Sequence, residues 1–97
     1  MSEALQHPEH RELTDREREI LAFEASWRPG QAGREAEIRE RFDISTPRYH
    51  QLLNALIDTP EALAHDPLLV KRLRRLRASR QRMRSAKRLG IDLNIDV

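Results

Sequence analysis

Apolar residues recur every three or four positions through most of the chain, and this spacing predicts a fold built from α-helices. The first series is Ile20, Phe23 and Trp27, which lie on one side of a helix expected over 15–27. A proline and two glycines follow within 28–33, so this segment should end the helix and form a loop. We expect the aromatic residues of the series to belong to the core rather than to a recognition surface.

Two polar residues mark where the first helix begins. Thr14 and Glu17 have the spacing of a capping box, in which each side chain accepts a hydrogen bond from the backbone amide of the other residue. Residues 1–12 are polar, contain Pro8 and lack periodicity. They predict a flexible N-terminal segment.

The middle of the chain predicts two helices joined by a tight turn. The first is short and spans 34–42, and the turn after it holds apolar Ile44. The second spans 46–58 and begins with Ser45 or Thr46 as its cap. Its apolar face consists of Tyr49, Leu52, Leu53, Leu56 and Ile57.

The last third of the chain predicts a short helix over 59–65 and a long one over 67–89, which Gly90 should end. In the long helix, the last apolar residue at the spacing of a packed face is Leu76. The first turns of this helix should therefore dock on the bundle, and the rest should project into solvent. At 1.5 Å per residue the whole helix is roughly 35 Å long. These docking positions are Leu69, Leu73 and Leu76.

The predicted fold class is therefore all-α, a small helix-turn-helix bundle of four to five helices. The bundle comprises residues 13–66 and is followed by a basic helix over 67–90. A tail over 91–97 alternates apolar residues with Asp and Asn, which fits either a strand-like or a disordered segment.

Charge is distributed very unevenly, although the formal net charge is only +2. Residues 1–66 contain eight arginines and fourteen Asp or Glu residues, whereas 67–89 contain ten Lys or Arg and no acid. Such a cationic helix favours a polyanionic partner, most often nucleic acid, unless it is merely solvated or lies against the acidic bundle. The phosphate-contact candidates are Lys71, Arg72, Arg74, Arg75, Arg77, Arg80, Arg82, Arg84, Lys87 and Arg88.

The two helices over 34–42 and 46–58 have the arrangement that places a second helix in the major groove of DNA. The polar face of the second helix carries side chains of the kinds that pair with base edges. An ordinary three-helix cluster with a solvated polar face would show the same pattern. The base-contact candidates are Thr46, Arg48, His50, Gln51 and Asn54.

Two resemblances rest on these residues. The segments LTDREREIL (13–21) and EIRERFDIS (37–45) resemble region four of bacterial sigma factors and LuxR-type DNA-binding domains. Most of the span 13–90 resembles a family of small actinobacterial proteins of unknown function, through LTDREREILAFE, LNALID, PEALAHDP and LVKRLRRLR. The first resemblance implies that Thr46, Arg48, His50 and Gln51 face the groove.

This sequence departs from the sigma-factor pattern at three positions, of which Phe42 in place of the usual leucine is harmless. Asp43 stands where the turn usually has glycine, so it must adopt a left-handed or bridge conformation, which Asp tolerates better than most residues. Pro47 occupies a position that sigma factors often fill with a charged residue, which removes one potential contact.

Other classes of function find little support. The chain has no cysteine, no apolar stretch long enough to span a bilayer and no signal peptide, so we expect a cytoplasmic protein. His7 and His10 are three residues apart but lack further ligands nearby, which argues against a metal site. We find no nucleophile–base pair and no glycine-rich phosphate loop, and we expect neither an enzyme nor a cofactor.

The sequence thus predicts a protein that binds double-stranded DNA, as a transcription regulator or a nucleoid-associated factor. Alternatively, the basic helix binds an acidic surface of RNA polymerase or another regulator, and the helix-turn-helix is only scaffold. The sequence does not decide whether the protein also forms a homodimer through the first turns of the basic helix.

Overall fold

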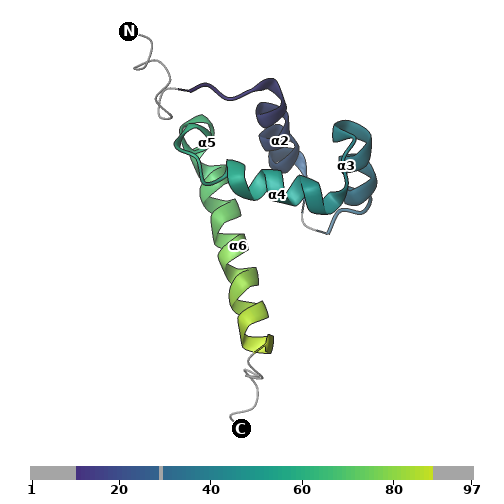
Figure 1. Ribbon diagram of the computed structural model, residues 1–97, viewed down its shortest axis with the longest axis vertical. Coiled ribbons are helices and arrows are strands. Elements are labelled where there is room, and N and C mark those ends of the chain that lie inside the picture. Colours follow the sequence, from purple (N-terminus) through teal and green to yellow (C-terminus); the bar gives the residue numbers. More distant parts are fainter. Residues whose placement is uncertain (1–10, 29, 89–97) are drawn as a thin grey trace.

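The computed structural model describes residues 11–28 and 30–88, and this part of the chain forms five helices and no strand (Figure 1). The predicted all-α class is confirmed. The predictions for residues 1–10, for the end of the basic helix at Gly90 and for the tail lie outside the described residues. The helices are α2 (Asp15–Ser26), α3 (Arg34–Phe42), α4 (Thr46–Leu56), α5 (Pro60–His65) and α6 (Pro67–Arg88).

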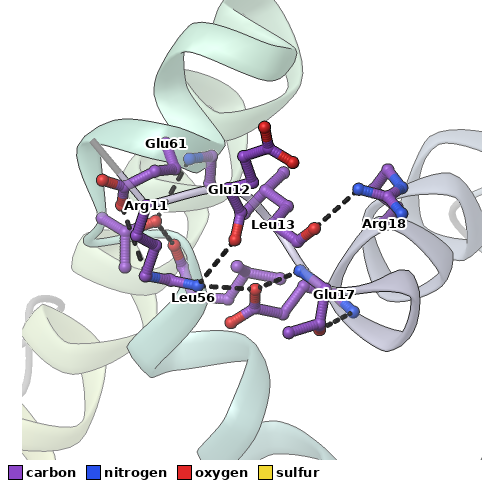
Figure 2. Close-up of polar contacts among 10 residues, drawn as sticks. Arg11, Glu12, Leu13, Glu17, Arg18, Leu56 and Glu61 are labelled. Carbon is purple, nitrogen blue, oxygen red and sulfur yellow. Dashed lines mark hydrogen bonds and ion pairs between the residues drawn. The ribbon is translucent and has the colours of Figure 1, made fainter. Parts of the chain in front are cut away.

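The capping box at the start of α2 is confirmed. The Glu17 amide donates to Thr14 Oγ1 at 3.1 Å, and the Thr14 amide donates to Glu17 Oε1 at 2.9 Å. Arg11 donates to the same Glu17 oxygen at 2.9 Å and lies 3.8 Å from Glu61 Oε1 of α5 (Figure 2). Arg11, within the predicted flexible segment over 1–12, is therefore attached to the bundle.

A three-residue turn joins α3 to α4. Asp43 has a φ of 57° in the left-handed region, which agrees with the expectation for this position. Ser45 caps α4 by accepting from the Arg48 amide at 3.3 Å, and half-buried Ile44 packs against the core.

Helix α4 ends at Leu56, two residues before its predicted end. The amides of Asp58 and Thr59 donate to carbonyls three residues back, those of Ala55 and Leu56, and these bonds form a tight turn. The Thr59 hydroxyl donates to the Leu56 carbonyl at 2.8 Å, and it accepts from the Ala62 amide as the cap of α5. One side chain thus closes α4 and opens α5.

The core lies where α2, α3, α4 and the first turns of α6 meet. Phe23, Phe42 and Tyr49 pack at ring-centroid distances of 5.3–5.9 Å, and two of the three pairs are T-shaped, with the edge of one ring against the face of the other. Trp27 is only partly buried beside Phe23. The Phe23 ring contacts Trp27, Phe42 and Tyr49 and is therefore the centre of the aromatic cluster.

The docked part of α6 is shorter than predicted. Leu69, Val70 and Leu73 are buried, but Leu76 is 45% exposed. The prediction that Leu76 belongs to the docked seam was wrong, and Val70 was missed. The apolar packing of α6 ends at Leu73, and the C-terminal half of the helix extends beyond the other helices (Figure 1).

Arginine side chains complete the docking where the leucines stop. Arg74 Nε donates to the Ile57 carbonyl at 2.6 Å. Arg77 binds both oxygens of Asp58, at 2.7 and 3.2 Å, and also donates to the Asn54 carbonyl at 3.2 Å. These bonds satisfy carbonyl groups at the C-terminal end of α4, which have no partner within the helix. They fix the direction in which α6 leaves the bundle.

Candidate nucleic-acid interface

The outer face of α4 presents two of the predicted base-contact residues. Arg48 and Gln51 are exposed, and Arg48 Nη1 donates to Gln51 Oε1 at 3.2 Å. Because Tyr49, Leu53 and Leu56 face the core, helical spacing places these two polar side chains on the opposite side. They form a pair of hydrogen-bonding groups directed away from the bundle.

The other three candidates do not share that face. Thr46 is half-buried in the first turn of α4. His50, also half-buried, and exposed Asn54 lie on the side of α4 that faces α6. Of the predicted five, two therefore lie on the outer face of α4, two on its flank toward α6, and Thr46 in its first turn.

His50 and Asn54 line a cleft between α4 and the projecting part of α6, which we call the α4–α6 cleft. It has a volume of about 380 Å³. Its apolar lining is Leu53, Ile57 and Leu73. Its cationic lining is Arg34, Arg77, Arg80 and Arg84.

A buried carboxylate lies at one end of the α4–α6 cleft. Glu24 is 6% exposed, and its Oε2 accepts from the Tyr49 hydroxyl at 2.5 Å and from Arg34 Nη2 at 2.7 Å. The Arg34 guanidinium also lies 5.3 Å from the centroid of the Phe23 ring, a cation–π distance. These contacts join the end of α2, the start of α3 and the middle of α4.

Sequence reasoning missed Glu24 and Arg34, although a signal for Glu24 was present. Glu24 follows Ile20 by four residues, so it lies on the buried face of α2, where an ionised group needs partners. No comparable signal pointed to Arg34, because its role depends on the way α3 packs against α2.

The surroundings of the α4–α6 cleft shift two pKa values. Burial, followed by the hydrogen bond to Glu24, raises the pKa of Tyr49 far above its usual range, so its hydroxyl remains a donor. Burial also lowers the pKa of His50, and the charges of Arg34 and Arg80 lower it further, whereas Glu24 opposes them. His50 is therefore held in its neutral form at neutral pH.

The ten cationic candidates of α6 fall into two groups. Arg74 and Arg77 are half-buried and make the internal contacts to α4, and the ion pair with Arg77 lowers the pKa of Asp58. The other eight are exposed. Within residues 11–28 and 30–88, none of these eight forms an ion pair.

Two further observations concern metals and membranes. The part of the chain that the structure describes contains no cluster of three or more His, Cys, Asp or Glu side chains that could hold a metal ion. His7 and His10 lie outside it. Among its helices, none has the length and apolar character to cross a bilayer.

Comparison with known proteins places the chain in a family. No curated protein and no solved structure matches it. Residues 12–85 match a family described as a protein of unknown function (DUF3263). This match spans α2 to α5 and most of α6. It therefore shows that the chain belongs to the DUF3263 family, an all-helical domain of unknown function.

Proposed function

We propose that this protein binds double-stranded DNA, with α4 in the major groove and α6 on the phosphate backbone. The observation that carries the proposal is the fixed relation between these two helices. Arg74 and Arg77 hold α6 to the C-terminal end of α4, and eight exposed cations lie before and after them along α6. A long cationic helix in a defined orientation beside a polar helix face suits a duplex better than it suits a small ligand.

The local geometry of α3 and α4 supports the proposed groove contact. The two helices are joined by a three-residue turn, and the second has one buried and one polar face, as in helix-turn-helix domains and in the sigma-factor region that the sequence resembles. Arg48 can bind guanine through two hydrogen bonds, and Gln51 can bind adenine in the same way. Contact with bases would replace the hydrogen bond that these two side chains make with each other.

On this proposal the cations of α6 supply affinity and the outer face of α4 supplies sequence preference. Phosphate contacts orient a protein on the duplex without reading its sequence. Such a protein would act as a transcription regulator or a nucleoid-associated factor in the cytoplasm.

One observation favours a second candidate, an acidic surface of RNA polymerase or of another regulator. Exposed apolar residues lie among the cations of α6, with Leu76 at 45% and Met83 at 56% exposure. Phosphate backbones offer little for such side chains to pack against, whereas a protein surface offers both acidic and apolar groups.

Fluorescence anisotropy with labelled duplex DNA tests the first candidate. We expect log affinity to fall linearly with log salt concentration, with a slope of about −0.9 for each phosphate contacted. The double variant Arg48→Ala/Gln51→Ala should weaken a selected sequence more than a random duplex. Arg75→Gln/Arg82→Gln should weaken both equally.

Absence of binding to any duplex at low salt would refute the DNA proposal. Retention of RNA polymerase on the immobilised protein after nuclease treatment, together with that absence, would support the second candidate. Binding that is indifferent to Arg48 and Gln51 would mean that α4 does not read bases and that only the backbone is bound.

A further inference from the structure

We infer that the α4–α6 cleft binds a doubly charged phosphate group, as in a phosphomonoester. The inference does not rest on DNA binding, because its evidence is the composition of the cleft itself. The phosphate could belong to a free small molecule or to the phosphorylated end of a nucleic-acid strand. Both sources present the same dianion, and they can be separated by experiment.

The charges that line the cleft leave an excess that matches a dianion. Glu24 is bound to Arg34, and Asp58 is bound to Arg77. Arg80 and Arg84 have no carboxylate within ion-pair distance among the described residues. Two positive charges are therefore uncompensated, and a phosphomonoester above its second pKa of about 6 carries nearly two negative ones.

The buried face of α6 continues directly into these two arginines. Leu73, Arg77, Arg80 and Arg84 follow at spacings of four, three and four residues, so they lie along one side of the helix. The first packs in the core, the second binds α4, and the last two line the α4–α6 cleft. The docking of α6 therefore fixes the direction in which these four side chains point.

The concave shape of the cleft, with side chains of α4 and α6 on its walls, suits a small anion. A volume of about 380 Å³ lies within the range of small-molecule sites, and three aliphatic side chains line part of it. Arginine forks bind phosphate oxygens in pairs, and the aliphatic lining could pack against the organic part of the ligand. Arg80 and Arg84 also line a groove with Leu76, Met83 and Lys87, but all of its lining residues belong to α6, so no group of α4 completes it.

His50 provides a further hydrogen-bonding group and a reporter. Its imidazole is half-buried, and no hydrogen bond engages it within the described residues. The charged groups around it are Glu24 from α2, Arg34 from α3 and Arg80 from α6. A bound dianion would offset the two arginines, so the pKa of His50 should rise when phosphate binds.

Glu24 does not oppose this assignment. Its carboxylate is buried and already bound by a guanidinium and a phenol, so its charge is compensated within the protein. It also holds Arg34 in place at the cleft.

The test is an NMR titration of the full chain with inorganic phosphate at pH 7.5 and constant ionic strength. We expect saturable shifts of the His50 ring signals and a rise of the His50 pKa in the bound state. Arg80→Gln/Arg84→Gln should weaken phosphate binding about tenfold or more, the usual effect of losing hydrogen bonds between charged groups. Dimethyl phosphate, a singly charged diester, should bind more weakly than inorganic phosphate.

The matched control is Arg75→Gln/Arg82→Gln, which removes the same charge from the opposite side of α6 by helical spacing. Because all four side chains are exposed, both double variants should fold, and their thermal midpoints check this. The control should change phosphate affinity less than twofold. Equal losses in the two variants, or no His50 response at millimolar phosphate, would overturn the inference.

Two further arms identify the source of the phosphate. If a duplex with a 5′-phosphate shifts His50 and the same duplex without it does not, the source is a strand end. If both duplexes leave His50 unchanged while a nucleoside 5′-monophosphate shifts it, the source is a free phosphomonoester. Phosphate binding without any duplex binding would refute the DNA proposal and leave this inference intact.

Discussion

Replacing Tyr49 with phenylalanine isolates one hydrogen bond of the buried network. The ring is fully buried among Phe23 and Phe42, so Tyr49→Phe keeps the packing and removes only the hydroxyl. That hydroxyl donates to Glu24 Oε2 at 2.5 Å, and Glu24 is 6% exposed. Removing a donor to a buried charged acceptor costs about 2 kcal/mol of unfolding free energy.

This loss is large relative to the stability expected for a domain of this size, and it is easily measured. For 60–100 residues, each kcal/mol lowers the thermal midpoint by about 4–8 °C, so we expect a decrease of about 8–16 °C. Urea denaturation followed by circular dichroism gives the free energy directly, and an unchanged m-value would show that the compactness of both states is preserved.

A double-mutant cycle with Glu24→Met checks that the loss comes from this contact. Without the carboxylate, Tyr49→Phe should cost about 1 kcal/mol less than it does in the native protein. A cost below about 0.5 kcal/mol in the native background, or an equal cost in both backgrounds, would refute the network as a source of stability.

Changes at three further places in the chain test single features of the fold. Asp43→Val should lower stability by about 1–2 kcal/mol in urea denaturation, because a β-branched residue is strained at a φ of 57°, whereas Asp43→Gly should stay within about 1 kcal/mol of the native value. Truncation after Ala78 should shift the thermal midpoint by no more than about 2 °C, because every buried residue among those that the structure describes lies before it; a larger drop would show that the projecting half of α6 packs. The same truncation should flatten the salt dependence of duplex binding by removing five of the ten α6 cations. Arg77→Gln should raise the pKa of Asp58 toward its ordinary value, since the ion pair lowers it, and a carboxyl NMR titration that showed no change would contradict this.

The positions of the helices could be predicted because their signals are local. Thr14 with Glu17, the left-handed turn at Asp43, and the cap at Ser45 each involve residues no more than three apart. Hydrogen bonds at such spacings form wherever the backbone takes the helical path, whatever the helix later packs against. The predicted bounds of α3 are accordingly those observed.

The flank of α4 that faces α6 could not be predicted in the same way. Helical spacing shows that His50 and Gln51 are both off the core face, but it does not show which of them a neighbouring helix will approach. That choice depends on where α6 crosses α4, which the contacts of Arg74 and Arg77 with the end of α4 determine. The periodicity of the sequence does not reveal contacts between an arginine and a carbonyl group 17 or 23 residues away.

Because α6 crosses α4, the cations on its two sides have different surroundings. On the side that continues from Leu73, the cations face α4 and line a cleft of limited volume. On the opposite side, Arg75 and Arg82 face only solvent. A polyanion can approach the solvent side anywhere along the helix, whereas the α4–α6 cleft admits a single small anion. The basic helix is therefore two surfaces rather than one, and paired substitutions on its two sides can separate their functions.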